Sequence, residues 1–303
     1  MQKFIKFALL GLLGFFALLL VWGLVEPYFF DVHAETVAIP NLPASWQGQR
    51  VAIISDFQVG MWLDNLPTVR RIVDRIIQER PAAVIILGDF IYHGGKDASL
   101  RIQKASELVR PIMENGIPVY AVLGNHDYSV VSSKQPDIDY QRARNMGQAL
   151  ASFGVHMLQN ETLSLQTPGS GSGSQKALLL VGVGSHMPGL DDPARALSGL
   201  SNDAPRLVAM HNPDSFEDIA PGQAPVAVAG HTHGGQIRLP FTPNWTWLTF
   251  LEEDEIHADG WIKDYGQPGN RLYVNRGIGF SKLPLRINCP PELTLFTLTR
   301  PES

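Results

Sequence analysis

The N-terminal 30 residues differ from the rest of the chain in their pattern of apolar and charged positions. Lys3 and Lys6 come first, residues 7–25 carry no charge, and Glu26-Pro27 ends the run. A helix of roughly 20 apolar residues crosses the hydrocarbon core of a bilayer. This run is apolar on every face of such a helix, which is typical of a membrane span. The pattern predicts a membrane anchor over residues 1–30 and one domain over residues 31–303.

A cleaved signal peptide is the alternative interpretation of this segment. Val32-His33-Ala34 has the small-residue spacing of a cleavage site. However, the apolar region of a signal peptide is only ~7–15 residues long, so the longer run favours a retained anchor. The next basic residue after the run is Arg50. Because flanking positive charge stays in the cytoplasm, we expect the N-terminus there and the domain outside.

From about residue 38 onward, apolar runs alternate with amphipathic stretches. Continuous β-branched runs indicate strands that are buried on both faces, and apolar positions at helical spacing indicate helices outside them. The chain is therefore predicted to have an α/β fold. The predicted strands are residues 50–55, 82–87, 117–123, 177–183, 206–210, 225–229, 271–274 and 292–298, and the predicted helices are residues 65–79, 99–115 and 140–153.

Two segments interrupt this alternation. Residues 167–176 read TPGSGSGSQK, a composition typical of a flexible loop. Apolar residues on both sides indicate that this loop is the tip of a hairpin. Residues 241–265 combine aromatic side chains with four consecutive acids, residues 252–255. We interpret this second segment as an insertion near the site that could contact an acyl chain or the membrane interface, although packing on the domain is the simpler alternative.

Composition excludes some classes of function. The formal net charge is −5 and 17% of the residues are charged, whereas a nucleic-acid-binding domain is expected to be basic. Cys289 is the only cysteine, so an internal disulfide is impossible and a thiol-ligated metal cluster is not expected. The nine histidines are more informative, because several of them directly follow predicted strands.

Polar clusters follow five of the predicted strands. Each cluster alone could be a turn or a helix cap. Their shared placement is more specific, because ligands of α/β proteins bind at the carboxyl ends of strands. Crowded buried carboxylates and imidazoles require cations to balance them, and two divalent metals would do so. The clusters are Asp56, Gly88-Asp89, the run Gly124-Asn125-His126-Asp127, His211, and the run Gly230-His231-Thr232-His233.

The order D-x-(H), GD, GNHD, H and GHxH resembles that of the calcineurin-like metallophosphoesterases. The match runs from about Val51 to Gln236. The later runs NRGIG (residues 275–279), PLR (284–286) and PPEL (290–293) resemble the membrane-associated phosphodiesterase branch of that family. The resemblance implies a four-layer αββα sandwich and a metallophosphoesterase catalytic domain over residues 31–303.

The resemblance also implies roles for individual residues. Two metals could share a bridging hydroxide and clamp an in-line displacement at phosphorus. His126 would stand near the leaving group and could protonate it, and Asp127 would support the same catalytic loop. The implied first-metal ligands are Asp56, Gln58, Asp89 and His233, and the second-metal ligands are Asp89, Asn125, His211 and His231, with Asp89 bridging.

Gln58 is the departure from the family pattern, which has His at this position. Glutamine ligates through its amide oxygen, so the first site would have mostly oxygen ligands. Oxygen ligands suit Mn²⁺ or Mg²⁺, whereas imidazole suits Zn²⁺ and Fe. We therefore expect two divalent ions, with Mn²⁺ supporting activity best and Zn²⁺, Fe or Mg²⁺ as alternatives.

The leading prediction is a membrane-anchored phosphohydrolase that cleaves phosphodiester or pyrophosphate bonds of a phosphorylated small-molecule or lipid-linked substrate. Some relatives cleave UDP-diacylglucosamine in lipid A synthesis, but that substrate is cytoplasmic and the flanking lysines place the domain outside. A membrane-tethered binding protein with a degraded site is the alternative from another class, favoured only by Gln58. A phosphoprotein phosphatase is disfavoured, because Tyr92 stands where those enzymes place a second acid.

Overall fold

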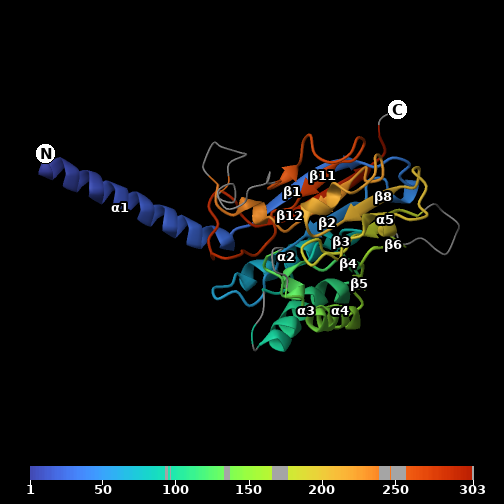
Figure 1. Ribbon diagram of the computed structural model, residues 1–303, viewed down its shortest axis with the longest axis horizontal. Coiled ribbons are helices and arrows are strands. Elements are labelled where there is room, and N and C mark those ends of the chain that lie inside the picture. The colour runs from blue at the N-terminus through green and yellow to red at the C-terminus, as the bar shows by residue number, and fades with distance from the viewer. Residues whose placement is uncertain are drawn as a thin grey trace.

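A single long helix stands apart from the rest of the molecule (Figure 1). The computed structural model describes residues 1–92, 95, 97–132, 137–165, 177–238, 246 and 257–301. Helix α1 (Gln2–Val25) projects away from the domain, and only Gly23 among its residues is buried. Residues Gln2–Tyr28 are long and apolar enough to cross a membrane. The structure thus confirms a candidate span where the sequence predicts one.

In the described part of the domain, the strands form two sheets of six strands each. Most neighbouring strands within each sheet are parallel, so the carboxyl ends of β2, β3 and β4 share one edge, as do those of β7, β8 and β9. The first sheet has the order β1 (Asp31–Ala38), β12 (Glu292–Thr299), β2 (Arg50–Ile54), β3 (Ala83–Ile86), β4 (Val119–Ala121), β5 (His156–Met157). The second has the order β10 (Gly260–Trp261), β11 (Leu272–Val274), β9 (Ala227–Ala229), β8 (Arg206–Ala209), β7 (Leu179–Gly182), β6 (Glu161–Ser164).

The two sheets pack face to face, and helices cover their outer faces. Ala52 and Ile54 of β2 point to the helical side, whereas Val51 and Ile53 point to the second sheet, as the period of a strand requires. The first sheet is covered by α2 (Leu66–Glu79), α3 (Ala98–Glu114) and α4 (Tyr140–Ser152), and the second by the short α5 (Pro193–Ala196) and the 3-10 turn η4 (Pro213–Phe216). This arrangement confirms the predicted four layers, with a thin fourth layer.

The predicted helices and strands are all present, with ends displaced by a few residues. The predicted hairpin is the antiparallel pair β6 and β7, and its tip, residues 167–176, lies outside the described residues. Most of the aromatic segment 241–265 also lies outside them. Its described end belongs to the core, because Trp261 stacks on Phe296 with ring centroids 5.8 Å apart. The sequence pattern did not reveal β1, because this edge strand is half exposed and lacks an apolar run.

A buried carboxylate joins the two sheets. Glu292 begins β12 of the first sheet, and its Oε1 accepts a hydrogen bond of 2.7 Å from the Tyr273 hydroxyl in β11 of the second. Arg276 Nε donates to Glu292 Oε2 at 2.8 Å. Burial and the charge of Glu292 raise the pKa of Tyr273 far above its ordinary value, so the tyrosine stays a donor. The pairing fixes the position of the chain that follows β11.

Removal of this carboxylate should destabilise the domain strongly. We expect Glu292→Ala to lower the free energy of unfolding by about 3–5 kcal/mol, because it leaves the buried Tyr273 hydroxyl without its acceptor and the largely buried Arg276 with only the exposed Asp31 as a partner. Glu114→Ala is the control, since Glu114 pairs with Arg110 at the surface and should contribute less than about 1 kcal/mol. Urea denaturation in detergent, followed by circular dichroism, measures both. Equal midpoints for the two variants would contradict the bracing role of Glu292.

Candidate metal centre

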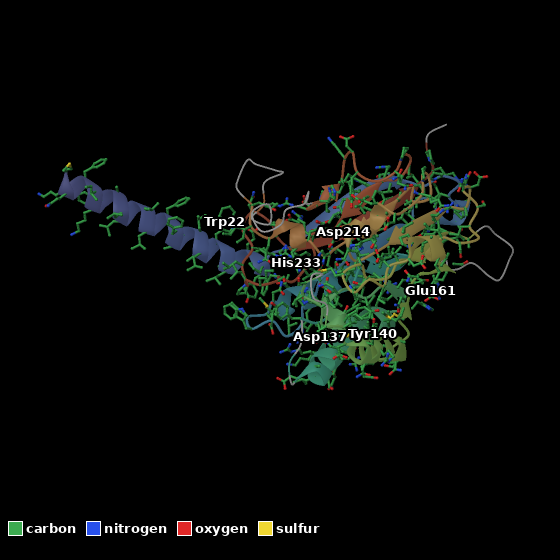
Figure 2. The ribbon with its side chains drawn as sticks, in the orientation of Figure 1. Trp22, Asp137, Tyr140, Glu161, Asp214 and His233 are labelled. Atoms are coloured by element: carbon green, nitrogen blue, oxygen red, sulfur yellow. The ribbon has the colours of Figure 1, made fainter. Side chains whose placement is uncertain are left out.

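The polar residues that follow five predicted strands meet at one rim of the sandwich. β2, β3 and β4 of the first sheet and β8 and β9 of the second end at this rim, so the loops after them face one another. Figure 2 shows His233 inside the domain, close to the junction with α1. The structure brings together all nine predicted site residues, which are Asp56, Gln58, Asp89, Asn125, His126, Asp127, His211, His231 and His233.

One group of possible metal ligands consists of Asp56, Asp89 and His233. A ligand atom from each lies within 4.8 Å of the others. Asp56 Oδ1 is 3.6 Å from His233 Nε2. The Gln58 amide reaches the same place, with its nitrogen 2.8 Å from Asp89 Oδ2 and 3.5 Å from His233 Nε2. Gln58 therefore contacts two of the three other predicted ligands of the first site, Asp89 and His233.

The second group consists of Asp89, His211 and His231, within the same limit of 4.8 Å. His211 Nε2 lies 3.3 Å from Asp89 Oδ2, 3.2 Å from His231 Nδ1 and 3.1 Å from Asn125 Oδ1. Asn125 thus joins this group through its amide oxygen. Asp89 belongs to both groups, which is the arrangement that a bridging carboxylate requires.

Contacts behind the ligand atoms orient two of these side chains. His211 Nδ1 is 2.7 Å from the Leu87 carbonyl oxygen, so this nitrogen carries the proton and Nε2 offers a lone pair to the rim. Asn125 Nδ2 donates to the Val130 carbonyl at 2.7 Å. Since the amide nitrogen is thereby used, the Asn125 oxygen points at His211. Both orientations suit metal ligation.

Backbone strain is concentrated in this cluster. Asp56, Gln58, Asp89, His231 and His233 all have positive φ, between 51° and 71°. This left-handed region costs a non-glycine residue of order 1 kcal/mol or more, and it persists where the surrounding structure imposes it. Because these five strained residues lie close together, we infer that the loops adopt this backbone conformation in order to direct their side chains toward one point.

The electrostatics show how strongly the groups are crowded. Burial raises the pKa of Asp56 to about 6, against the opposing charge of His211. Burial and the charge of Asp89 raise the pKa of Asp127 to about 7. Burial alone would raise the pKa of Asp89 too, but the charges of His211 and His126 hold it well below its usual range.

The pKa values of the histidines are also shifted in opposite directions. Burial would lower the pKa of His211, but the adjacent Asp89 carboxylate raises it to about 9. Burial and the charge of His211 lower the pKa of His231 to about 3, and burial with the charge of Arg286 lowers that of His233 well below its usual range. His231 and His233 are therefore neutral, which is the state that metal ligation needs, whereas a cation at His211 would have to displace the second proton of that ring.

The donor set fits divalent cations. Asp56 Oδ1 and Gln58 Oε1 are buried oxygens without a hydrogen-bond partner among the described residues. A buried oxygen in that position costs free energy unless a cation or another donor satisfies it. The two groups together offer carboxylate, amide and imidazole ligands, which suits first-row divalent ions.

His126 and Asp127 have different positions at the rim. His126 is largely buried, with Nε2 4.0 Å from Asp89 Oδ2, and its ring stacks on Tyr92 at 5.2 Å. The Asp127 carboxylate instead accepts hydrogen bonds from the backbone amides of Gly124 at 2.9 Å and Asp89 at 3.0 Å. Asp127 therefore positions the two loops, while His126 borders the space between the ligand groups.

Sequence reasoning gave no role to several residues that build this rim. A Cβ on Gly277 would lie 2.7 Å from Asp56 Cβ, and a Cβ on Gly279 would lie 2.8 Å from Gln58 Cβ. The buried Arg286 donates to the His233 carbonyl at 3.2 Å. The runs NRGIG and PLR were the available signal, but their spacing alone did not connect them to the ligand loops.

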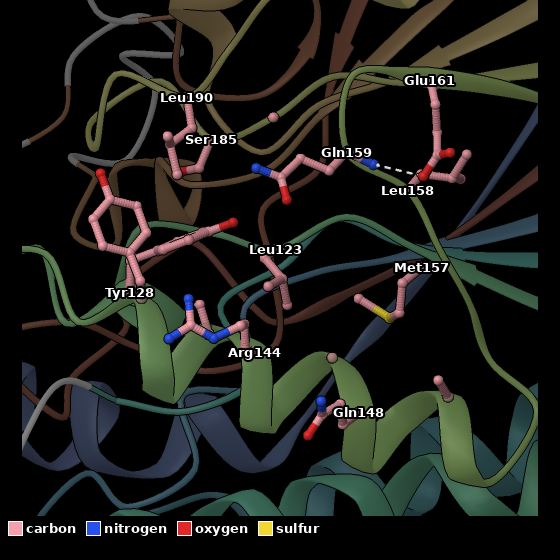
Figure 3. Close-up of a pocket in the computed structure, with 15 residues that line it drawn as sticks. Leu123, Tyr128, Arg144, Gln148, Met157, Leu158, Gln159, Glu161, Ser185 and Leu190 are labelled. Atoms are coloured by element: carbon pink, nitrogen blue, oxygen red, sulfur yellow. Dashed lines mark hydrogen bonds between the residues drawn. The ribbon is translucent and has the colours of Figure 1, made fainter.

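A cavity of about 410 Å³ adjoins the rim beyond β4 and β7 (Figure 3). It lies between α4 and the loops after β5 and β7. Tyr128, which directly follows Asp127, forms one end, and the Arg144 and Gln159 side chains point into the space. Its lining is mostly apolar, so it could hold an organic group next to the ligand cluster.

Two glycine variants test the close packing behind Asp89. A Cβ on Gly124 would lie 2.6 Å from the Asp89 nitrogen and 2.7 Å from His211 Cε1, so Gly124→Ala must displace a predicted ligand. We expect Mn²⁺ affinity, measured by calorimetry, to fall by about tenfold or more. Gly147→Ala in α4 is the control, because nothing lies within 4 Å of its Cβ. It should retain the affinity and gain about 0.5–1 kcal/mol of stability. Equal affinities would contradict this account of the centre.

Comparisons with known proteins agree with this geometry. Residues 49–235 match the profile of the calcineurin-like phosphoesterase family. The chain is 32% identical over 227 residues to phosphodiesterase YaeI of Escherichia coli, which covers 73% of this chain and 72% of that protein. It is 26% identical over 279 residues to the uncharacterised metallophosphoesterase YkuE of Bacillus subtilis, which covers 90% and 87%.

A third relative has a named lipid-like substrate. The chain is 26% identical over 304 residues to UDP-2,3-diacylglucosamine pyrophosphatase LpxG of Chlamydia trachomatis, with coverage of 89% of this chain and 90% of that protein. The profile match includes the ligand groups around Asp89, His211 and His231. The chain therefore belongs to the calcineurin-like phosphoesterase family and is a hydrolase that acts on phosphate esters.

Proposed function

We propose that this protein is a membrane-anchored, dinuclear metal-dependent phosphohydrolase that cleaves phosphodiester or pyrophosphate bonds. Residues 1–30 are the anchor and residues 31–303 the catalytic domain. The observation that carries the proposal is the shared position of Asp89 in two groups of ligand atoms. Asp56, Gln58 and His233 complete the first group, and Asn125, His211 and His231 complete the second.

The ligand set explains how the chain serves this chemistry. When bound, two divalent ions activate water as a nucleophile and neutralise the phosphoryl oxygens. Asp89 offers one carboxylate to both groups, and Asn125 supplies a neutral oxygen that adds no negative charge near an anionic substrate. His126, at the surface of the cluster, holds the proton that the departing oxygen takes up. Asp127 keeps the Asn125–His126 loop and the Asp89 loop in register.

The relatives and the neighbouring cavity support the class of substrate. One relative is named a phosphodiesterase and another a pyrophosphatase of a diacylated sugar nucleotide, so both act on phosphorus atoms with two organic substituents or a diphosphate. The apolar cavity beside Tyr128 offers room for such a substituent. Hydrolysis of UDP-2,3-diacylglucosamine is the second candidate, favoured by the full-length similarity to LpxG.

Metal removal tests the first-site ligands. After treatment with a chelator, we expect Mn²⁺ to restore hydrolysis of bis(p-nitrophenyl) phosphate better than Zn²⁺, because the Gln58 amide makes the first site rich in oxygen. Gln58→His should tighten the first site for Zn²⁺ by about tenfold or more and shift the preference toward Zn²⁺. Calorimetry of metal binding provides a readout that is independent of turnover.

Gln103→His on the exposed face of α3 is the matched control, since it adds the same imidazole far from the rim. It should leave both the affinity and the metal preference unchanged. Tightly retained Zn²⁺ with no response to Mn²⁺ would contradict the proposed metal. Unchanged affinity in Gln58→His would show that Gln58 is not a ligand.

The side of the membrane separates the two candidate substrates. The lysines before the span predict that the domain lies outside the cytoplasm. Protease added to intact spheroplasts should therefore digest the domain, while a cytoplasmic marker protein stays intact until lysis. Protection of the domain until lysis would overturn this orientation and would favour UDP-2,3-diacylglucosamine as the substrate.

A further inference from the structure

The end of α1 is fastened to the domain without a flexible linker. α1 continues directly into the 3-10 turn η1 (Glu26–Tyr28). Pro27 in this turn accepts hydrogen bonds at its carbonyl oxygen from Thr68 Oγ1 at 2.9 Å and Asn65 Nδ2 at 3.4 Å. The Tyr28 hydroxyl donates to the Asp64 carbonyl at 3.2 Å. The segment that leads from Gln58 into α2 is thus bonded to the base of α1.

A second segment holds the other side of the same helix end. The Gly23 carbonyl of α1 accepts a hydrogen bond of 3.0 Å from the Arg286 amide. Gly23 packs so closely that an added Cβ would lie 3.1 Å from Ile287 Cγ1. The buried Glu26 carboxylate accepts hydrogen bonds from the amides of Asn288 and Cys289. Two independent segments therefore fix the direction of α1 relative to the domain.

The length of α1 places this junction at a membrane surface. From Lys6 to Val25 the helix rises about 29 Å at 1.5 Å per residue. The hydrocarbon core is about 30 Å thick, so with Lys6 at one interface the junction lies at the opposite one. Because Gly23, Glu26 and Pro27 are bonded to the domain, the two segments that hold them lie at that interface as well.

The same two segments carry exposed apolar side chains. Among the residues that the structure describes, seven large apolar side chains outside α1 are exposed. Four of them lie within three residues of a position bonded in the junction: Phe29 after η1, Trp62 and Leu63 before Asp64, and Leu283 before Arg286. Trp62 is 73% exposed, which is costly in water and favourable at the interface, where indole rings concentrate.

These segments also lead directly to residues of the candidate metal centre. Trp62 lies four residues after Gln58, and Leu283 lies four residues after Gly279, whose carbonyl is 3.4 Å from His233 Nδ1. Cys289, which is bonded to Glu26 of the junction, donates its thiol to the His233 carbonyl at 3.4 Å. A short chain of hydrogen bonds through Cys289 therefore connects the base of α1 to the predicted ligand His233.

We propose that the face formed by Phe29, Trp62, Leu63 and Leu283 rests in the interface of the bilayer that α1 crosses. The metal centre then opens at the level of the lipid headgroups and takes the phosphate linkage of a lipid-linked substrate without withdrawing it from the membrane. This inference rests on the proposed membrane-anchored phosphohydrolase and narrows its substrate class. The hydrolysis transfers the phosphoryl group to water and releases the organic leaving group with a proton.

Lipid quenching tests where this face lies. Full-length Trp62→Cys and Leu283→Cys proteins, labelled with a small fluorophore and reconstituted in phospholipid vesicles, should be quenched strongly by lipids that carry nitroxides near the headgroup. Ser198→Cys is the control, because Ser198 is exposed after α5, at the end of the domain far from α1 (Figure 1). The native Cys289 is buried and should not be labelled. Quenching at the two test positions no stronger than at residue 198, in protein that resists carbonate extraction, would overturn the inference.

Paired reporter substrates test the consequence for activity. In the double variant Trp62→Ser with Leu283→Ser, kcat/KM for hexadecyl p-nitrophenyl phosphate in vesicles should fall by about fivefold or more, which corresponds to ~1 kcal/mol. Hydrolysis of the water-soluble bis(p-nitrophenyl) phosphate should stay within about twofold, since both side chains are exposed at the surface whereas the ligand groups are buried. Equal losses on both reporters would count against the inference. Failure of the unmodified protein on both reporters would instead refute the proposed function, and the quenching result would still decide the position of the face.

Discussion

The rim of the sandwich depends on one buried carboxylate that two groups of ligands share. Asp89 Oδ1 accepts the His126 amide at 2.8 Å, and its Oδ2 faces the Gln58 amide and the His211 ring. Its backbone amide is held in turn by Asp127. An ionised carboxylate out of water is tolerated only when every side of it is paired. Loops from both sheets therefore converge on Asp89, and their left-handed residues follow from that convergence.

Buried hydrogen bonds connect α1, the two sheets and the candidate metal centre. Glu292 in β12 is hydrogen-bonded to Tyr273 in β11, which joins the two sheets. The chain that follows β11 then packs against Asp56 at Gly277. That chain continues to Arg286 and Cys289, which hold the His233 carbonyl and the base of α1. The route from α1 to a predicted ligand thus runs through paired buried groups. Such an arrangement transmits position, because none of these groups can move without leaving another unsatisfied.

Gln58 departs from the family pattern without disturbing the geometry around it. Its side chain is buried, its backbone shares the positive φ of the neighbouring ligands, and its amide lies between Asp89 and His233. An amide is a neutral ligand whose oxygen and nitrogen exchange places by a rotation of half a turn. We therefore expect the substitution to change the affinity of the first site for particular ions while it keeps the ligand count. This supports a working centre with an altered metal preference over a degraded one.

The amino-acid sequence by itself determined the elements whose signal is local. Unbroken apolar runs predicted the central strands, helical spacing predicted α2, α3 and α4, and the polar clusters after the strands predicted the members of the rim. The helix α1 was equally clear as a candidate span, because its length and lack of charge need no tertiary partner. Only the tertiary structure decided β1, which is half polar and exists because it pairs with β12 across the whole chain.

Tertiary structure also decided what surrounds the predicted ligands. Gly277, Gly279 and Arg286 support Asp56, Gln58 and His233 from more than 40 residues away in the chain. The same is true of Glu26, whose partners are at residues 288 and 289. Close approach and buried hydrogen bonds between distant segments leave no periodic pattern in the sequence. The sequence therefore predicted the candidate ligands, and the fold determined how they are held together and how closely they are connected to the base of α1.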